Sequence, residues 1–301
     1  MSFDLLVSAL IAGLLLGGFY AAVTVGISIS FGILDIVNIA HPGFIILGSY
    51  FAYLLNSKFG IDPILAGIIA LPAFYALGAA VYQVYYVSFE RRGKEALAGL
   101  AFFFGLLFIS EVLLVLGVGV DYRYVQAGYI DQNLGKFLGA AGSALPKLIA
   151  ELPMRMLVPC VGSLLMFGAL LAFIKRTFIG RAIMAVAQDQ LALQLMAADP
   201  IRIKRIAFAI SIATAALAGA FLIIIQPVEP SVGREYIGRV FAICVLGGLG
   251  SLPGTIIGAM LLGVVESITS TFYGPSWAPA VAFGLLLLTL AFRPSGILGR
   301  Q

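Results

Sequence analysis

Long apolar runs fill the chain from its first residues to its last, and mostly short polar stretches separate them. About 20 apolar residues are enough for a helix to cross the ~30 Å hydrocarbon core of a bilayer. The runs therefore predict an all-α polytopic membrane protein of about eight transmembrane helices, two of them broken or re-entrant, with 1–301 as a single transmembrane domain. The predicted segments are 5–30, 35–56, 62–88, 95–118, 155–175, 203–226 and 277–293, with an interrupted pair at 236–250 and 253–273.

Two apolar runs contain Gly, Pro and polar residues that interrupt a helix. The first interruption lies in Phe31–Gly48 and the second in Leu246–Gly258. Non-helical backbone inside a bilayer is tolerated only where it is buried in protein or lines a cavity, so we expect both to border a transport path. The expected path residues are Asp35, Asn38, His41, Pro42 and Gly43 in the first interruption, and Gly247, Gly248, Gly250, Ser251, Pro253 and Gly254 in the second.

Two roles are open for the polar residues of the first interruption. Asp35, Asn38 and His41 are three residues apart, so on a helix they would share roughly one face and could contact a solute. Alternatively, Asn38 and His41 cap the broken helix. Glu111 and Glu266 are the other acids within apolar runs. A charged acid inside the bilayer is energetically unfavourable, so its presence indicates a role in transport unless it lies near the end of a segment.

The composition excludes a soluble protein. Apolar residues make up 61% of the chain and charged residues 11%, and the mean hydropathy is +1.09. Cys160 and Cys244 lie in apolar runs, so we expect both to behave as small buried hydrophobic side chains. His41 is the single histidine, and neither a metal-binding spacing nor a phosphate-binding GxxxxGK[ST] motif occurs, so we expect no metal or nucleotide on this chain.

The distribution of basic residues predicts the topology. Most of the 18 Lys and Arg residues fall in 89–95, 175–205 and the C-terminal end, which we therefore expect on the cytoplasmic side. The remaining basic residues, Arg234 and Arg239 among them, are expected outside and are balanced by acids. A cytoplasmic C-terminus requires 236–273 to enter from outside, turn at LGGLGSLPG and return; a single kinked crossing would put the C-terminus outside.

Two connections are long enough to have structure of their own. Residues 119–154 form an external loop, either a solvated connector or a contact for an extracytoplasmic partner. In 177–205, about 17 residues without Gly or Pro run from Gly180-Arg181 to Asp199-Pro200. They predict one amphipathic helix with a sharp C-terminal end, which docks either on the membrane domain or on a cytoplasmic partner.

Four motifs, in this order, carry a resemblance to a known family. They are NIAH at Asn38–His41 with Phe44 and Gly48, GRAIMAVAQD at 180–189, VLGGLGSLPGTIIGA at 245–259 and RPSGILGR at 293–300. Together they resemble the branched-chain amino-acid ABC transporter permeases of the LivH type, over essentially the whole chain. The chain departs from the family pattern at Pro42, at Met184 and at Ala198–Pro200.

The resemblance implies the permease fold of an ABC importer in the bacterial inner membrane, and no catalytic activity on this chain. The implied partners are a LivM-like second permease, two LivG/LivF-like ATPases that bind ATP and Mg, and an extracytoplasmic solute-binding protein. The helix at 181–199 is implied to be the cytoplasmic coupling helix. Its implied coupling residues are Gly180, Arg181, Ala182, Ala185, Ala187, Asp189 and Leu191.

The apolar segments also restrict the solute. No cluster of fixed charge lines them, so we expect a small, largely apolar solute with a polar group. Leucine, isoleucine and valine fit, and relatives of this permease type also carry urea, amides, and aromatic or small organic acids. A second class of function is an ion-coupled carrier that binds a proton or cation at Asp35, Glu111 or Glu266. A membrane enzyme built on His41 is a third, weaker class, because no paired nucleophile accompanies it.

Overall fold

The computed structural model describes residues 3–93, 95–139, 146–195, 197–293 and 295–299, and within them the named elements are all helices. The predicted all-α polytopic class is therefore confirmed. The helices are α1 (Phe3–Ser30), α2 (His41–Phe59), α3 (Pro63–Ser88), η1 (Glu90–Arg92), α4 (Glu95–Val118), α5 (Leu134–Phe137), α6 (Lys147–Ala150), α7 (Met154–Arg176), α8 (Phe178–Gln188), α9 (Gln190–Leu195), α10 (Pro200–Ile225), α11 (Val232–Gly247), α12 (Leu252–Tyr273), η3 (Pro275–Trp277) and α13 (Ala278–Phe292).

Two classes of helix make up the bundle. Seven helices of the described part, namely α1, α3, α4, α7, α10, α12 and α13, are long and apolar enough to cross a membrane. Two further helices, α2 and α11, follow or precede polar interruptions, and α11 has only 16 residues. The sequence predicted about eight transmembrane helices and did not distinguish these seven long helices from α2 and α11.

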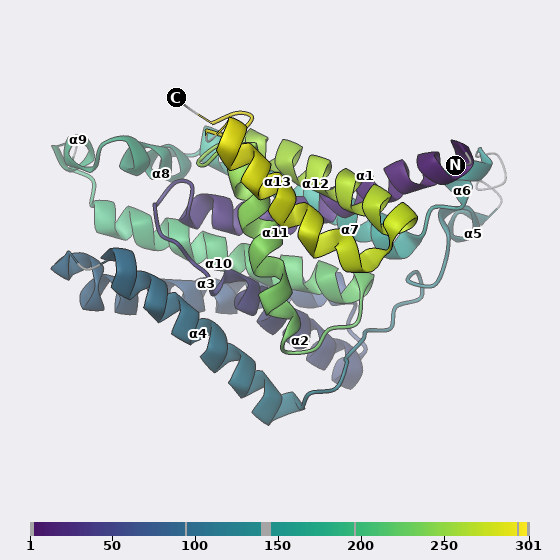
Figure 1. Cartoon of the computed structure of the whole chain (residues 1–301). Coiled ribbons are helices and arrows are strands. Elements are labelled where there is room, and N and C mark those ends of the chain that lie inside the picture. Colours follow the sequence, from purple (N-terminus) through teal and green to yellow (C-terminus); the bar gives the residue numbers. More distant parts are fainter. Residues whose placement is uncertain (1–2, 94, 140–145, 196, 294, 300–301) are drawn as a thin grey trace.

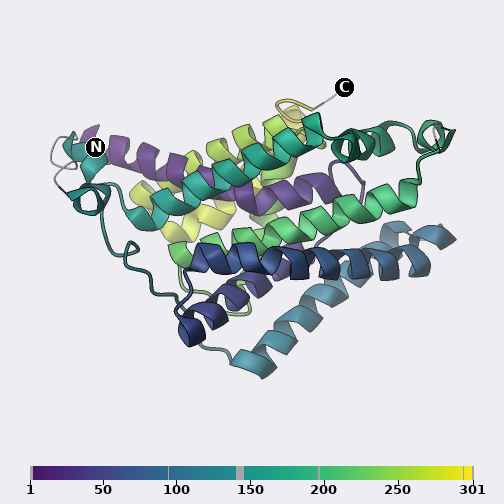
Figure 2. The same cartoon turned by 180° about the vertical axis from the view of Figure 1, so that it is seen from behind.

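Most of the long helices run roughly side by side, whereas α4 slants away from them and α11 lies obliquely across them (Figure 1). One end of the bundle carries α8 and α9, and we call it the α8 end. The opposite end carries the start of α1 together with α5 and α6, and we call it the loop end. Seen from behind, α10 runs between α7 and α3 (Figure 2).

Helix α10 is the centre of the bundle. Its apolar residues face neighbours on all sides, and α3, α2 and α1 are the helices that pack on it most extensively. Gly219 allows one of these approaches, because a Cβ there would lie against the Ile45 carbonyl and 2.5 Å from the Ser49 amide nitrogen. The Ser49 hydroxyl donates to the Gly219 carbonyl at 2.7 Å, which satisfies polar groups in the apolar interior.

The hairpin of α11 and α12 has the predicted direction. Its turn contacts the C-terminal segment, where the Leu298 amide donates to the Gly247 carbonyl at 3.1 Å. Leu298 also lines a cavity together with Arg181 of α8, so this segment lies at the α8 end. The alternative of a single kinked crossing, with the C-terminus on the opposite side, is therefore wrong. Of the residues used in the predictions, Lys94, Pro294 and Arg300 lie outside the described part.

Candidate translocation and coupling sites

The first interruption is a non-helical connection of ten residues between α1 and α2. The segment predicted from residue 35 becomes helical only at His41, and Asp35 has a left-handed backbone conformation with φ of 56°. Asp35, Asn38 and His41 therefore do not share a helix face, and this prediction is wrong. The cause is local, because Asp tolerates the left-handed conformation that reverses the chain, and Pro42 suits the first turn of the new helix.

Asn38 and His41 are completely buried, and they do not cap α2. The N-cap position is Ala40, which has no side-chain capping hydrogen bond. The side-chain oxygen and nitrogen of Asn38 and both ring nitrogens of His41 have no well-formed hydrogen bond, although the Val23 carbonyl lies near enough to act on the imidazole. A buried polar group without a partner costs about 1–3 kcal/mol. The capping alternative is thus not supported, and these polar atoms are available to another partner.

His41 lies where α1, α2 and α10 meet. A Cβ on Gly26 would overlap the His41 ring, and would lie 2.6 Å from both the Ser211 carbonyl oxygen and Thr214 Oγ1. The Ser211 hydroxyl donates to the Gly26 carbonyl at 2.7 Å. The lack of a side chain at Gly26 therefore makes room for a buried polar cluster around the imidazole.

The N-termini of α2 and α11 meet in the bundle. A Cβ on Gly233, in the first turn of α11, would lie 3.5 Å from the Pro42 carbonyl oxygen and 3.6 Å from the Gly43 nitrogen. Neither helix has a side-chain N-cap. Because a helix N-terminus carries partial positive charge and free N–H groups, this junction suits a negatively charged group such as a carboxylate.

The second interruption is a tight turn, as predicted. Helix α11 ends at Gly247, and Gly248 and Gly250 have φ of 99° and 78°, which side chains rarely adopt. Helix α12 begins at Leu252, and the Ser251 hydroxyl caps it by accepting from the Gly254 amide at 3.2 Å. Pro253 lies in the first turn of α12, a position that proline favours.

The two interruptions contact each other and α8. A Cβ on Gly250 would lie 2.7 Å from the Gly32 carbonyl oxygen, so the two turns touch through their backbones. A cavity of about 530 Å³ joins them at the α8 end. Its lining residues include Gly32 and Ile33 from the first interruption, Leu249–Pro253 from the second, and Arg181, Met184, Ala185, Ala187 and Gln188 from α8.

The predicted single helix at 181–199 is wrong. The structure has α8 and the shorter α9, separated by Asp189 in an extended conformation. The Asp189 carboxylate accepts from the Leu191 amide at 2.8 Å, which makes it a cap for α9. Aspartate competes for backbone N–H groups in this way and favours a helix start over a helix interior, which explains the break. The predicted end of this helix at Asp199-Pro200 is also wrong, because α9 ends at Leu195 and Asp199-Pro200 is instead the start of α10.

The predicted coupling residues divide into two groups. Gly180 and Ala182 are buried and Ala185 is half-buried, so they fasten α8 to the bundle. Gly180 packs directly on the backbone of Ile174 in α7. The other four, Arg181, Ala187, Asp189 and Leu191, are exposed. We call these four residues the exposed face of α8 and α9; Arg181 and Ala187 of this face also line the cavity that borders both interruptions.

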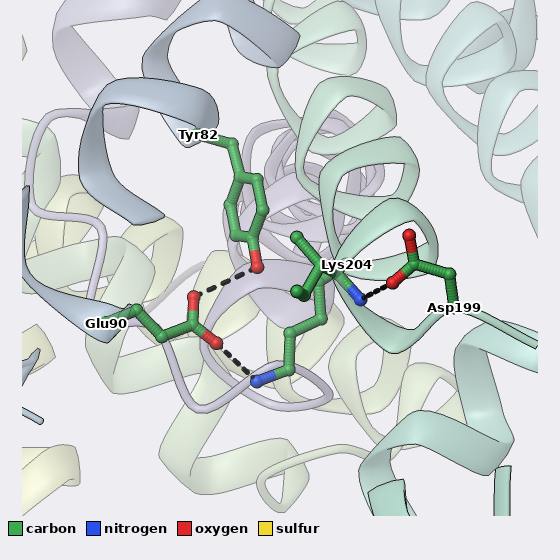
Figure 3. Close-up of polar contacts among 5 residues, drawn as sticks. Tyr82, Glu90, Asp199 and Lys204 are labelled. Carbon is green, nitrogen blue, oxygen red and sulfur yellow. Dashed lines mark hydrogen bonds and ion pairs between the residues drawn. The ribbon is translucent and has the colours of Figure 1, made fainter. Parts of the chain in front are cut away.

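Behind this face lies a polar cluster that the sequence analysis missed. Figure 3 shows the Glu90 carboxylate between Lys204 of α10 and Tyr82 of α3. Lys204 Nζ lies 2.6 Å from Glu90 Oε1, and the Tyr82 hydroxyl donates to Glu90 Oε2 at 2.9 Å. The sequence offers no signal for this pair, because Lys204 stands between Arg202 and Arg205 in the basic start of α10 and nothing distinguishes it from them.

The acids within the apolar runs have basic partners. Glu111 Oε1 lies 2.5 Å from Arg234 Nη2, and the buried Glu266 lies 2.8 Å from Arg239 and accepts from the Tyr20 hydroxyl at 2.5 Å. The prediction that Arg239 lies in the outer region is wrong, because this residue is on α11 and pairs inside the bundle. Such pairing is how an apolar bundle carries an acid without an isolated charge.

A helical membrane bundle with two interruptions that touch in its interior, and a surface helix beside them, is typical of membrane transport proteins. A family model described as "Branched-chain amino acid transport system / permease component" matches residues 9–290. The chain belongs to this permease family, and the predicted resemblance to LivH-type permeases is confirmed.

Curated relatives agree over nearly the full length. The chain is 32% identical to the high-affinity branched-chain amino acid transport system permease protein BraD of Pseudomonas aeruginosa, over 97% of this chain and 95% of BraD. It is 27% identical to the permease protein LivH of Escherichia coli K12, over 96% of this chain and 94% of LivH. It is also 28% identical to LivM of the same organism, over 93% of this chain and 67% of LivM. No solved structure matches the chain.

Proposed function

We propose that this chain is a permease subunit of an ATP-driven importer for branched-chain amino acids. The observation that carries the proposal is the contact between the two polar interruptions and α8, since it connects a solute path to a surface on which a motor can act. The names of BraD and LivH, which match over nearly their whole length, support branched-chain amino acids as the solute.

The proposed solute path begins at the junction of α2 and α11. The partial positive charge of the two helix N-termini attracts the carboxylate of an amino acid, and the unpaired groups of Asn38 and His41 supply hydrogen bonds. Leucine, isoleucine and valine combine such a carboxylate with an apolar side chain that suits the surrounding helices. Urea and neutral amides lack the negative charge, which makes them weaker candidates than organic acids.

The proposed partners follow from the two ends of the bundle. Two ATPases, which hold ATP and Mg, dock on the exposed face of α8 and α9 in the cytoplasm. A solute-binding protein delivers the amino acid at the loop end, and a LivM-like chain is the second permease. In this proposal the chain belongs to the bacterial inner membrane and holds no cofactor of its own.

The ion-coupled alternative has less support. Glu111 and Glu266 are each paired with an arginine, and Asp35 is exposed at the connection between α1 and α2. A site for a driving proton or cation needs an acid that is free to bind it inside the bundle.

Two experiments test the proposal. The first is a gentle-detergent purification of the tagged chain from its native membrane, with mass spectrometry of the partners. Recovery of two ATPases and a second permease supports the importer, whereas a folded chain that purifies alone contradicts it.

The second experiment tests the solute path in proteoliposomes. His41→Ala and Asn38→Ala are expected to lower leucine uptake by at least about tenfold, because a hydrogen bond to a charged group contributes about 1.5–3 kcal/mol. The control is Gly284→Ala in α13, where the added Cβ meets nothing within 4 Å and which should leave uptake unchanged. Wild-type uptake by both variants in the interruption would contradict their place in the path.

A further inference from the structure

The buried ion pair of Glu90 and Lys204 is not explained by the solute path or by the exposed coupling face. Both oxygens of the Glu90 carboxylate are occupied, one by Lys204 and the other by Tyr82 (Figure 3). The side chains of Glu90 and Lys204 are 17% and 10% exposed, respectively, so the pair is partly shielded from water and salt. It joins the connection between α3 and α4 to the first turns of α10.

Aromatic side chains of α3, α4 and α10 pack against one another beside this pair, and Tyr82 belongs to both groups. The Tyr82 ring lies 5.9 Å from that of Phe208 in α10, and Phe208 lies 5.8 Å from Phe103 in α4. Tyr85 lies 5.2 Å from Phe103, which closes the cluster. A second polar link, from Arg205 Nη1 to Gln83 Oε1 at 3.2 Å, joins α10 to α3 nearby.

The Glu90–Lys204 pair lies along α10 between α9 and the polar cluster around His41, and this position indicates a mechanical role. Helix α10 begins at Pro200, only a few residues after α9, and the Asp199 carboxylate caps it by accepting from the Ile201 amide at 2.9 Å. The same helix reaches the first interruption, where Ser211 bonds to Gly26 and Thr214 lies beside His41. A displacement of α8 and α9 therefore has a direct route along α10 to the polar cluster around His41.

We infer that Glu90 and Lys204 are positioning residues that hold α3, η1 and α10 together as one rigid body, so that movement of α8 and α9 reaches the first interruption. The inference rests on the proposed ATP-driven import. Without the pair, the start of α10 bends at 199–204, and part of the movement is lost before it reaches the solute path. The pair remains closed throughout the transport cycle.

The test is the number of solute molecules taken up per ATP hydrolysed, measured with the assembled transporter in proteoliposomes. Glu90→Gln and Lys204→Gln are expected to lower this ratio by ~5-fold, within the range of coupling effects, while ATP hydrolysis continues. The reversed pair, Glu90→Lys with Lys204→Glu, should recover most of the ratio. Arg202→Gln is the matched control, because it removes one positive charge from an exposed position of the same turn.

A cross-link keeps the inference testable if the single variants do not assemble. Glu90→Cys and Lys204→Cys in one chain are joined by a short bismaleimide, while the natural Cys160 and Cys244 are buried. Cross-linked transporter should import at the wild-type ratio, because the pair never needs to open. A blocked cross-linked transporter, or single variants with an unchanged ratio, overturns the inference. Failure of the wild-type complex to import at all would instead contradict the proposed function.

Discussion

Gly32 and Gly250 face each other so closely that neither position has room for a side chain. They belong to interruptions near opposite ends of the sequence, and their contact brings the α1–α2 connection against the α11–α12 turn. The nearby hydrogen bond between Ser28 Oγ and Thr255 Oγ1, at 2.8 Å, supports the same contact. Any movement of one interruption relative to the other must therefore break this contact.

Alanine at Gly32 should separate the two interruptions. Its Cβ would overlap the Gly250 backbone nitrogen, and overpacking of this kind costs about 1–3 kcal/mol. We expect Gly32→Ala to lower the thermal unfolding temperature in detergent and to abolish uptake. The control is Gly284→Ala in α13, where the added Cβ meets nothing within 4 Å. If Gly32→Ala unfolds and transports like the wild type, the contact has no importance.

The outer face of α8 should tolerate substitutions structurally but not functionally. Ala187 is exposed, so a glutamate there does not disturb the core. We expect Ala187→Glu to leave the unfolding temperature unchanged and to abolish ATP-driven uptake, because a bulky charge blocks the docking of an ATPase. Ala187→Ser, which keeps the side chain small and uncharged, is the control. Normal uptake by Ala187→Glu would count against this face as the coupling surface.

The break between α8 and α9 should depend on Asp189. Its carboxylate caps α9, and loss of such a cap costs about 1 kcal/mol. We expect Asp189→Ala to raise hydrogen exchange of the α9 amides while α8 keeps its protection. Asp189→Asn retains an acceptor and serves as the control. Unchanged exchange in Asp189→Ala would show that packing alone holds α9.

The Glu266–Arg239 pair should be structural. Glu266 is 2% exposed, and removing one member of a buried pair leaves an uncompensated charge at a cost of about 3–5 kcal/mol. We expect Glu266→Gln to lower the unfolding temperature strongly, and the double variant Glu266→Gln with Arg239→Gln to recover part of the loss. Asp131→Asn, which breaks an exposed pair with Arg155, should change little. Full stability of Glu266→Gln would contradict a structural role.

The interruptions could be predicted because Gly, Pro and polar residues stand out in an apolar run. A helix boundary at Asp199-Pro200 was equally predictable, since proline cannot continue a helix from the residue before it, but the boundary is the start of α10 and not the end of the preceding helix. The conformation of 31–40 was not, because three-residue spacing implies a shared face only if the chain is helical there. The break at Asp189 depends on one capping hydrogen bond, and spacing alone does not reveal it.

The side-chain pairs could not be predicted for a different reason. Glu90 and Lys204, like Glu266 and Arg239, come from separate helices, and only the packing of those helices brings them together. For this reason the sequence predicted Arg239 in the outer region, although it pairs with Glu266 inside the bundle. The same limit applies to Asn38 and His41, whose complete burial depends on the packing of the helices around them.

Uptake of labelled leucine into proteoliposomes that contain the chain with its co-purified partners is the decisive measurement for ATP-driven import. We expect uptake that requires ATP and the solute-binding protein, and that persists when proton and sodium gradients are abolished. Uptake by this chain alone, driven by an ion gradient without ATP, would contradict it.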